Sequence, residues 1–254
     1  MEFDYYNWLL VFLRVSAFLL VLPFFSSTNF PARLRVALGA FTALMLAPTL
    51  PPFPLGKLGF FDLSGVMLKE VGFGLLLGFV SRMVFYAADM AGNIISTELG
   101  LNMGTIFNPM THQQSQVAGT VLFFLAAVVM LTLDLHHWIL VGFQRTYMVL
   151  PIGGGHLNEM LFDDVLNHTS RIFIVALQIS APTLAVSFVV TLVFAVLSRA
   201  VPQMNVFILS FSFRIIGGLA VFGFTLQLTA QHVLNYLNRL PDDLLRLAQQ
   251  VGVG

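Results

Sequence analysis

Long apolar stretches, separated by short polar or proline-rich breaks, make up most of this chain. Apolar segments extend over residues 5–28, 36–50, 66–97, 117–150, 171–197 and 204–235. A helix needs about 20 residues to cross a bilayer. The first segment therefore fits one span, the second is short, and the third is longer than one span. This pattern predicts an all-α, polytopic membrane protein built from kinked helical hairpins.

Three breaks within the pattern predict where helices end. The second segment ends in the proline cluster 48–54, which we expect to be non-helical because proline removes a backbone donor and clashes with the preceding turn. The run Asp134-Leu135-His136-His137 predicts that the fourth segment is divided into two shorter helices. The last two segments are long and only a few residues apart, so they predict a helical hairpin.

The C-terminal tail changes character from about Gln231. Its leucines recur at helical spacing among polar residues, and Pro241 with the two aspartates after it predicts the start of a new helical turn. We expect this amphipathic tail to be an interfacial or subunit-packing helix. The leucines are Leu234, Leu237, Leu240, Leu244, Leu245 and Leu247.

Composition supports an apolar environment for the chain. Hydrophobic residues make up 57% of the 254 residues and charged residues only 9%, whereas a soluble domain carries about 25% charged residues. The net charge is zero, so no electrostatic argument points to nucleic acid, and we expect none as a partner. The absence of cysteine excludes disulfides, thiol catalysis and thiolate metal sites.

Charged residues at the segment ends indicate an orientation. Glu2 and Asp4 precede the first segment, and Arg33 and Arg35 follow it. The positive-inside rule places that first loop in the cytoplasm, and Arg199 places the tip of the last hairpin there too. Because the N-terminus lacks a basic region, we expect the first apolar stretch to remain in the mature protein.

A polar stripe interrupts the third segment. Arg82, Asp89, Asn93 and Ser96 follow one another at steps of seven, four and three residues, which places them on one helical face. A charge at mid-bilayer costs roughly 2.5–3.5 kcal/mol on insertion scales, so this face must contact protein or water. Two interpretations stay open: the lining of a polar path, or a buried contact between helices.

After the stripe the helix is expected to stop. Gly100, Gly104 and Pro109 break the pattern, and a polar run follows at 111–116. Non-helical backbone at membrane depth is tolerated only inside protein or beside water. The segment is therefore either a solvated loop outside the membrane or a re-entrant plug that obstructs a pore. The candidate plug residues are Ile106, Phe107, Asn108, Pro109 and Met110.

Glycines within the apolar segments indicate close helix packing. Gly72, Gly74 and Gly78 lie in the third segment, and Gly217-Gly218 interrupts the last one. Small residues let two helix backbones approach closely. We therefore expect these positions to lie at helix crossings.

Candidate chemistry is sparse. The histidines at 112, 136, 137 and 156 lack the spacing of a zinc site, so no metal is expected. The run Gly153-Gly154-Gly155-His156 has no Gly-Lys-Ser/Thr after it and is predicted to be a flexible external loop rather than a phosphate loop. No Ser/His/Asp arrangement or paired carboxylate stands out. We therefore expect neither an enzyme nor a cofactor.

Several runs are similar to a known family. The most specific is Pro202-Gln203-Met204-Asn205-Val206-Phe207, followed by Arg214-Ile215-Ile216-Gly217-Gly218. Over essentially the whole chain, the sequence resembles the FliR family of type III secretion export-gate subunits. Further matching positions are Gly92-Asn93-Ile94-Ile95, Gly100, Pro109, Ser115, Pro151, Gly154-Gly155, Ser170 and Ala181-Pro182.

The resemblance implies a function and partners. It implies a structural, pore-forming subunit of the flagellar export gate, in the basal body, that passes unfolded flagellar proteins across the bacterial inner membrane. The implied partners are homologues of FliP, FliQ and FlhB in a hetero-oligomer, with FlhA and the ATPase complex acting alongside. Residues 1–165 would be FliP-like, and residues 166–254 would form a FliQ-like hairpin with the amphipathic tail.

The resemblance also assigns roles to particular residues. It favours the plug interpretation for 104–116, and it places the hairpin tip at the cytoplasmic entrance near FlhB. The tip residues are Arg199, Pro202, Gln203 and Asn205, of which Asn205 suits a helix N-cap. The charges inside apolar segments would find partners on other subunits. These are Arg14, Arg82, Asp89, Glu98 and Arg214.

One alternative function comes from a different class. Asp89 and Glu98 could be the proton or ion ligands of a secondary transporter or ion channel, since such proteins use buried carboxylates and discontinuous helices. No internal repeat is evident in the chain, and its segments do not pair into two matching halves. The residues alone therefore leave both functions open, and the resemblance favours the export gate.

Overall fold

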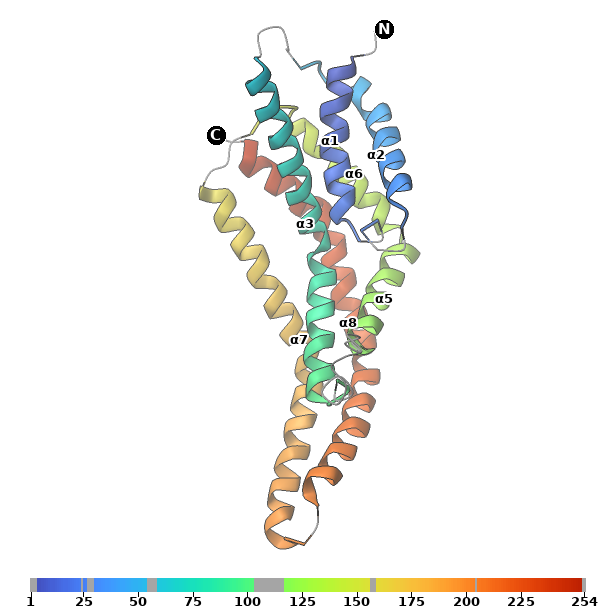
Figure 1. Cartoon of the computed structure of the whole chain (residues 1–254). Coiled ribbons are helices and arrows are strands. Elements are labelled where there is room, and N and C mark those ends of the chain that lie inside the picture. The colour runs from blue at the N-terminus through green and yellow to red at the C-terminus, as the bar shows by residue number, and fades with distance from the viewer. Residues whose placement is uncertain are drawn as a thin grey trace. The chain divides into compact units, whose positions relative to one another are not determined.

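The computed structural model describes residues 4–23, 25–26, 30–53, 59–102, 117–155, 159–203 and 205–252. Every regular element in these ranges is a helix (Figure 1), which confirms the predicted all-α class. The elements are α1 (Tyr5–Val21), α2 (Ala32–Leu46), the 3-10 turn η1 (Ala47–Thr49), α3 (Phe60–Glu98), α5 (Val117–Thr132), α6 (Leu135–Val149), α7 (Glu159–Ala200) and α8 (Val206–Gly252).

Several helices have the length and composition of membrane spans. Within the described ranges, α3, α7 and α8 are long and apolar enough to cross a bilayer, and α5 with α6 passes as one broken span bent by 75°. The bend lies at the predicted break, where Asp134 adopts a left-handed φ of 52°. The polytopic prediction is confirmed on these grounds.

The predictions about prolines hold in part: residues 50–53 of the proline cluster are non-helical as expected, but two prolines lie in helical turns. Pro48 lies within the 3-10 turn η1, at a first-turn position where the missing N–H would have no helical partner anyway. Pro241 does not start a new helix but lies inside α8. It packs against Gly142 of α6, where an added Cβ would lie 3.0 Å from the Pro241 Cα. Glycine at 142 leaves the room that this interior proline needs.

The chain forms two compact units. Unit 1 comprises Met1–Met83, Asp134–His168 and Asn238–Gly254, and unit 2 comprises Val84–Leu133 and Thr169–Leu237. Helices α3, α7 and α8 therefore each contribute residues to both units. The predicted division between residues 165 and 166 stays a prediction.

In unit 1, α3 crosses α1 at very short range. A Cβ on Gly74 would lie 2.3 Å from the carbonyl oxygen of Arg14, and one on Gly78 would lie 2.9 Å from that of Phe18. Glycine at these two positions lets the helix backbones touch, which confirms the predicted packing. The expectation does not hold for Gly72, which has nothing within 4 Å of such a Cβ.

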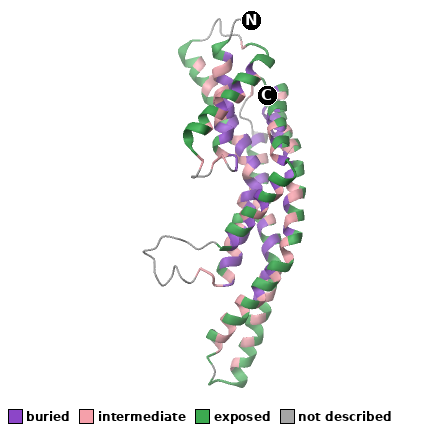
Figure 2. Cartoon of the chain, turned by 90° about the vertical axis from the view of Figure 1, so that its right-hand side faces the viewer, coloured by how far each residue is buried: buried purple, intermediate pink, exposed green. Residues whose placement is uncertain are grey.

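The C-terminal end of α8 belongs to the core of unit 1. Leu240, Leu244 and Leu247 are at most 1% exposed, and Figure 2 colours the chain by burial. The tail was expected to lie at an interface or against another subunit. Instead its apolar face is buried within its own unit, because it packs on α6 and on the connection that follows it.

In unit 2, α5 crosses α3 through a pair of glycines. A Cβ on Gly92 would lie 2.1 Å from the Cα of Gly119, so no larger residue fits at this crossing. A small apolar core surrounds it. Its buried residues are Ala88, Ala91, Ile95, Leu99, Ala118, Leu122, Ala176, Ile179 and Phe222.

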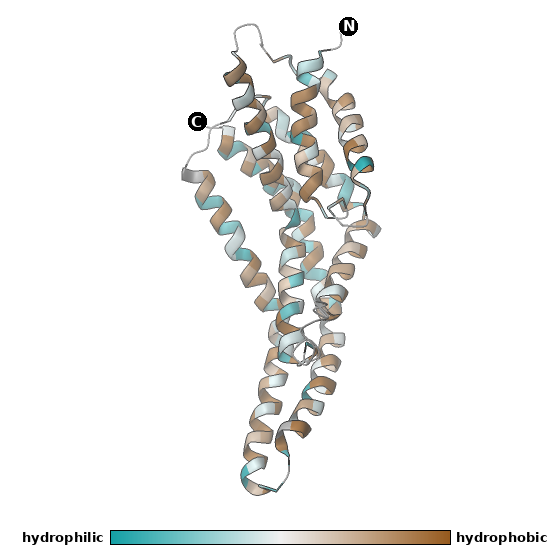
Figure 3. Cartoon of the chain, in the orientation of Figure 1, coloured by the Kyte–Doolittle hydropathy of each residue, from teal (hydrophilic) through white to brown (hydrophobic). Residues whose placement is uncertain are grey.

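The hairpin of α7 and α8 exposes large apolar side chains in unit 2. Phe188, Val196 and Phe224 are 61%, 70% and 86% exposed. Figure 2 shows the exposed positions along this hairpin, and Figure 3 shows that many of them are hydrophobic. Such a surface suits lipid or apolar protein rather than water.

Candidate functional site

A buried ion pair between Arg14 of α1 and Glu70 of α3 lies in unit 1. Both side chains are fully buried, with Arg14 Nε 2.5 Å from Glu70 Oε2 and Arg14 Nη2 2.9 Å from Oε1. The sequence placed the partner of Arg14 on another subunit. That expectation is wrong, because the partner is Glu70 of the same chain.

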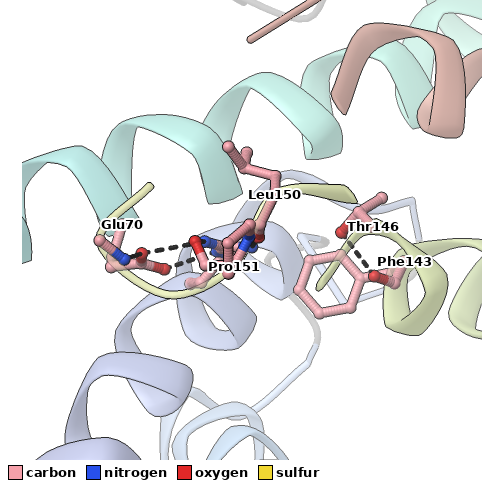
Figure 4. A network of polar contacts seen from close by, with 7 residues as sticks. Glu70, Phe143, Thr146, Leu150 and Pro151 are labelled. Atoms are coloured by element: carbon pink, nitrogen blue, oxygen red, sulfur yellow. Dashed lines mark hydrogen bonds and ion pairs between the residues drawn. The ribbon is translucent and has the colours of Figure 1, made fainter. Parts of the chain in front are cut away.

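Other groups complete the environment of this pair (Figure 4). The carbonyl of Leu150 accepts a hydrogen bond from Arg14 Nη1 at 2.9 Å, and the backbone N–H of Gly153 donates to Glu70 Oε1 at 2.9 Å. The guanidinium lies 4.3 Å from the ring centroid of Tyr147. Buried ion pairs persist only when further hydrogen bonds satisfy their remaining polar groups, and this cluster supplies them.

The glycine run after α6 was predicted to be a flexible external loop. It is instead part of this cluster, because the Gly153 N–H bonds to Glu70. Gly153 and Gly155 have φ values of +72° and +98°, a region that favours glycine. A Cβ on Gly153 would also lie 2.3 Å from the ring of Phe53. These backbone conformations let residues 150–155 fold over Arg14 and Glu70.

Glu70 is the residue that the sequence analysis overlooked. It is an acidic residue within the third apolar segment, as Arg14 is a basic residue within the first. Charged groups inside apolar segments pair with one another because lipid does not solvate them. Two opposite charges in separate apolar segments were therefore the available signal.

The predicted polar stripe lies on α3, but its members differ in burial. Ser96 is buried and its Oγ accepts a hydrogen bond from the Ala118 N–H at 3.4 Å in unit 2. Arg82, in unit 1, donates to Ser26 Oγ at 2.8 Å, so it too has a partner within the chain. Asn93 is half-buried and Asp89 is exposed. The role of the stripe stays a prediction.

An open groove of about 540 Å³ follows the same helix in unit 2. Asp89 and Glu98 both line it. The two residues are nine positions apart, which places them on opposite sides of a helix and roughly 13 Å apart along its axis. One cation could not bind both carboxylates at ligand distances of about 2.3–2.6 Å. The lining residues are Tyr86, Asp89, Met90, Asn93, Ile94, Thr97 and Glu98.

Glu98 and Arg214 both find partners in unit 2, although partners on other subunits were expected. Ser187 Oγ of α7 donates to Glu98 Oε1 at 2.7 Å. Arg214 Nη2 of α8 donates to Thr191 Oγ1 at 3.0 Å. The chain thus satisfies part of these charged groups internally.

The predicted hairpin is confirmed, with residues 201–205 connecting α7 to α8. Arg199, Pro202, Gln203 and Asn205 are all exposed at or beside this turn. Asn205 Oδ1 accepts a hydrogen bond from the Ile208 N–H at 3.4 Å, in the manner of a helix N-cap. The cytoplasmic location of the tip stays a prediction.

The candidate plug residues Ile106, Phe107, Asn108, Pro109 and Met110 lie outside the described residues. The predicted end of the preceding helix is confirmed, since α3 ends at Glu98 and Gly100 has a φ of +70°. The plug therefore stays a prediction.

One cluster of the described residues brings three possible metal ligands together. Ligand atoms of Asp134, His136 and His137 lie within 4.8 Å of one another at the bend between α5 and α6. The Asp134 and His137 side chains are largely exposed, and His137 Nδ1 lies 3.6 Å from Asp134 Oδ1. The three residues are close in sequence at the bend, which by itself brings these polar atoms near one another. The expectation that the chain carries no metal stays a prediction.

Comparison with known proteins gives one consistent result. The profile of the family described as bacterial export proteins, family 1, matches residues 5–240. The flagellar biosynthetic protein FliR of Bacillus subtilis (strain 168) is 31% identical over 212 residues, which cover 82% of this chain and 81% of the relative. FliR of Escherichia coli (strain K12) is 28% identical over 236 residues, with coverage of 92% and 90%. FliR of Aquifex aeolicus (strain VF5) is 26% identical over 228 residues, with coverage of 90% and 88%.

Proposed function

The chain belongs to family 1 of the bacterial export proteins, and on that premise we propose that it is a structural, pore-forming subunit of the flagellar type III secretion export gate. Membership makes it a component of the flagellar export apparatus, and its apolar helices suit a position in a membrane. The proposed role is to let unfolded flagellar proteins cross the inner membrane within the basal body. The family match over residues 5–240 carries the proposal.

The proposed partners are homologues of FliP, FliQ and FlhB. Exposed apolar side chains along α7 and α8 support such a hetero-oligomer, because they need a covering of protein or lipid. In this arrangement residues 1–165 are the FliP-like portion and residues 166–254 the FliQ-like hairpin. FlhA and the ATPase complex act alongside the gate, and no catalytic role is proposed for the chain itself.

The partner proposal has a direct biochemical test. The chain is expressed alone and together with FliP and FliQ homologues, and each preparation is extracted in the same detergent. We expect aggregation of the chain alone and a stable complex when the partners are present. A stable, functional monomer would contradict the proposal.

The hairpin tip is proposed to lie at the cytoplasmic entrance of the gate, near FlhB. Arg199 supports this side of the membrane by the positive-inside rule, and Ala200 is exposed. Because the chain has no cysteine of its own, Ala200→Cys introduces a unique thiol. We expect it to crosslink to a cysteine in the FlhB loop. If reagents confined to the periplasm label Ala200→Cys instead, the tip does not lie on the cytoplasmic side and the proposal is wrong.

The segment 104–116 is proposed to close the pore at rest. Ile106, Phe107 and Met110 are bulky and apolar, and such side chains exclude water and ions from a narrow constriction. The preceding stripe, with Asp89 and Asn93, would line the polar path. Both roles rest on the family resemblance and on residue chemistry.

The pore-forming role is tested in cells that lack their own FliR. The unchanged chain should restore secretion of flagellar proteins and motility. Replacement of Ile106, Phe107 and Met110 by glycine should raise membrane conductance to ions in complexes that still assemble. The matched control is Ile106→Val with Phe107→Leu and Met110→Leu, which keeps the apolar bulk. Normal assembly with unchanged conductance in the glycine variant would rule out the plug.

A further inference from the structure

Pro182 interrupts the hydrogen bonding of α7 without ending the helix. It lies in the interior of the Glu159–Ala200 helix, in the part that belongs to unit 2. Proline has no backbone N–H, so the carbonyl of Gln178, four residues earlier, lacks the donor that an α-helix normally provides. The proline ring also clashes with that carbonyl. Helix α7 therefore carries a backbone acceptor that needs another hydrogen-bond partner.

A small cavity of about 10 Å³ lies in unit 2 at this proline. One ordered water needs a cavity of about 10–15 Å³ and two to four polar partners, so the volume suits a single water molecule. Helices α7 and α8 both contribute to the walls. The lining residues are Gln178, Ile179 and Pro182 of α7 and Thr225, Leu228, Thr229 and His232 of α8.

The hydroxyl groups of the lining have only acceptor capacity left. Thr229 is 5% exposed, and its Oγ1 donates to the Thr225 carbonyl at 3.0 Å. Thr225 Oγ1 in turn donates to the Phe222 carbonyl at 3.0 Å. A hydroxyl has one donor hydrogen and two lone pairs. Both hydroxyls have therefore used their hydrogen, and what the cavity lacks is a donor.

We propose that this cavity binds one ordered water molecule, which donates one hydrogen to the Gln178 carbonyl and the other to the Thr229 hydroxyl. Ordered water is one of the ways in which backbone groups freed by a proline are satisfied in membrane helices. Among the described residues no carboxylate lines the cavity, so a neutral donor fits it better than a metal cation. The site lies within unit 2 and does not rest on the export role.

A density map of the assembled complex tests the site directly. The chain is purified with FliP and FliQ homologues, and the structure is determined at a resolution that shows ordered waters elsewhere in the complex. We expect a density peak about 2.5–3.0 Å from both the Gln178 carbonyl oxygen and Thr229 Oγ1. A map that shows other waters but none here would overturn the proposal. A lipid chain or a side chain of a neighbouring subunit in the cavity would overturn it too.

A double-mutant cycle tests the bridge by its energy. Thr229→Val removes the acceptor on α8 and should lower the thermal unfolding midpoint of the detergent-purified complex by about 2–4 °C. Pro182→Ala restores the N–H that pairs with the Gln178 carbonyl, so the bridge is no longer needed. In that background Thr229→Val should shift the midpoint by less than half as much. Equal shifts in the two backgrounds would show that the two sites are not coupled, and would overturn the bridge.

Two control variants separate the bridge from other effects of the substitution. Thr229→Ser keeps the hydroxyl and should retain most of the midpoint. Thr132→Val removes the same kind of bond within a helix, from Thr132 Oγ1 to the Val128 carbonyl at 2.8 Å, at an exposed site on α5, and should leave the midpoint unchanged. If Pro182→Ala prevents assembly, the density map of the unchanged chain decides alone.

Discussion

Arg14 and Glu70 are each fully buried, so neither would be stable there without the other. The desolvation penalty for a buried ion in real proteins is several kcal/mol, which a good partner offsets. Here the partner is bidentate, and a carbonyl, a backbone N–H and an aromatic ring supplement it. At the scale of single residues, the stability of unit 1 therefore depends on keeping both charges or neither.

Glu70→Ala leaves the guanidinium of Arg14 buried without its counter-ion. We expect a loss of about 3–5 kcal/mol in stability, seen as a lower midpoint in thermal unfolding of the detergent-purified complex. Arg14→Met combined with Glu70→Met should recover most of that loss, because it buries no charge. The exposed Arg145→Ala is the control and should leave the midpoint unchanged. A double variant as unstable as the single one would contradict the pairing argument.

Two substitutions at Tyr147 distinguish the contribution of its ring packing from that of its hydroxyl group. Its hydroxyl has no hydrogen-bond partner among the described residues, and the residue is 3% exposed. Tyr147→Phe keeps the ring beside Arg14 and removes a buried unsatisfied group, so stability should be unchanged or slightly higher. Tyr147→Ala should cost about 3–5 kcal/mol, as loss of a buried aromatic ring does. A destabilised Phe variant, measured by the same thermal unfolding, would reveal a partner for the hydroxyl.

Among the helices, glycines decide which pairs come into backbone contact. In unit 1, Gly74 and Gly78 bring α3 onto α1, and in unit 2 Gly92 and Gly119 bring α3 onto α5. At each crossing the atom that a new Cβ would strike belongs to backbone or to a β-carbon. Such atoms cannot move aside as a flexible side chain can. These helix pairs are therefore intolerant of even one added methyl group.

Gly92→Ala should separate α3 from α5, because its methyl group would lie 2.1 Å from the Gly119 Cα. We expect lower chain abundance in membranes and faster proteolysis of unit 2. Gly72→Ala on the same helix is the matched control. It meets no atom within 4 Å and gains about 1 kcal/mol of helix propensity. Equal proteolysis rates for the two variants would contradict the close crossing.

On the scale of the whole molecule, the two ends of the chain belong to one compact unit. Unit 1 contains the first 83 residues and also residues 238–254. The last turns of α8 pack on the connection that bonds to Arg14 and Glu70, since a Cβ on Gly155 would lie 2.8 Å from Val251 Cγ1. The core of unit 1 is therefore incomplete until the C-terminal end of the chain is in place.

A chain ending at Asn238 should fail to form unit 1. It lacks Leu240, Leu244 and Leu247, all buried, and each contributes about 1.5–3 kcal/mol. Their combined loss of roughly 5–9 kcal/mol is comparable to the whole stability of many domains, about 5–15 kcal/mol. We expect little full-size product in membranes by immunoblot.

The control for this truncation keeps the tail but changes its exposed face. Arg239→Ala, Asp242→Ala and Gln249→Ala together alter three exposed positions and should leave abundance unchanged. If the truncated chain accumulated and assembled like the full-length one, the tail would have no place in the core.

The sequence alone determined the class of the protein, its helical segments and its family. Periodicity and hydropathy predict helices because hydrogen bonds within a helix are local and the apolar composition sets the solvent. The break at Asp134, the hairpin at 201–205 and the end of α3 were all predicted from local residue chemistry. Only the tertiary structure decided which distant residues meet. Arg14 and Glu70 are 56 positions apart, and although two opposite charges in apolar segments indicate that a partner is needed, the local sequence around each does not specify which residue it meets.

The same reason explains the predictions that were wrong. Pro241 favours a helix end by local propensity, but it lies inside α8, where it packs against Gly142. Gly153 lies in a turn, as its propensity favours, but its hydrogen bond to the buried Glu70 makes that turn part of the cluster rather than an external loop. The leucines of the tail were correctly read as one apolar face, yet periodicity cannot say what covers such a face. That depended on long-range contacts, which form only when the two ends of the chain come together in unit 1.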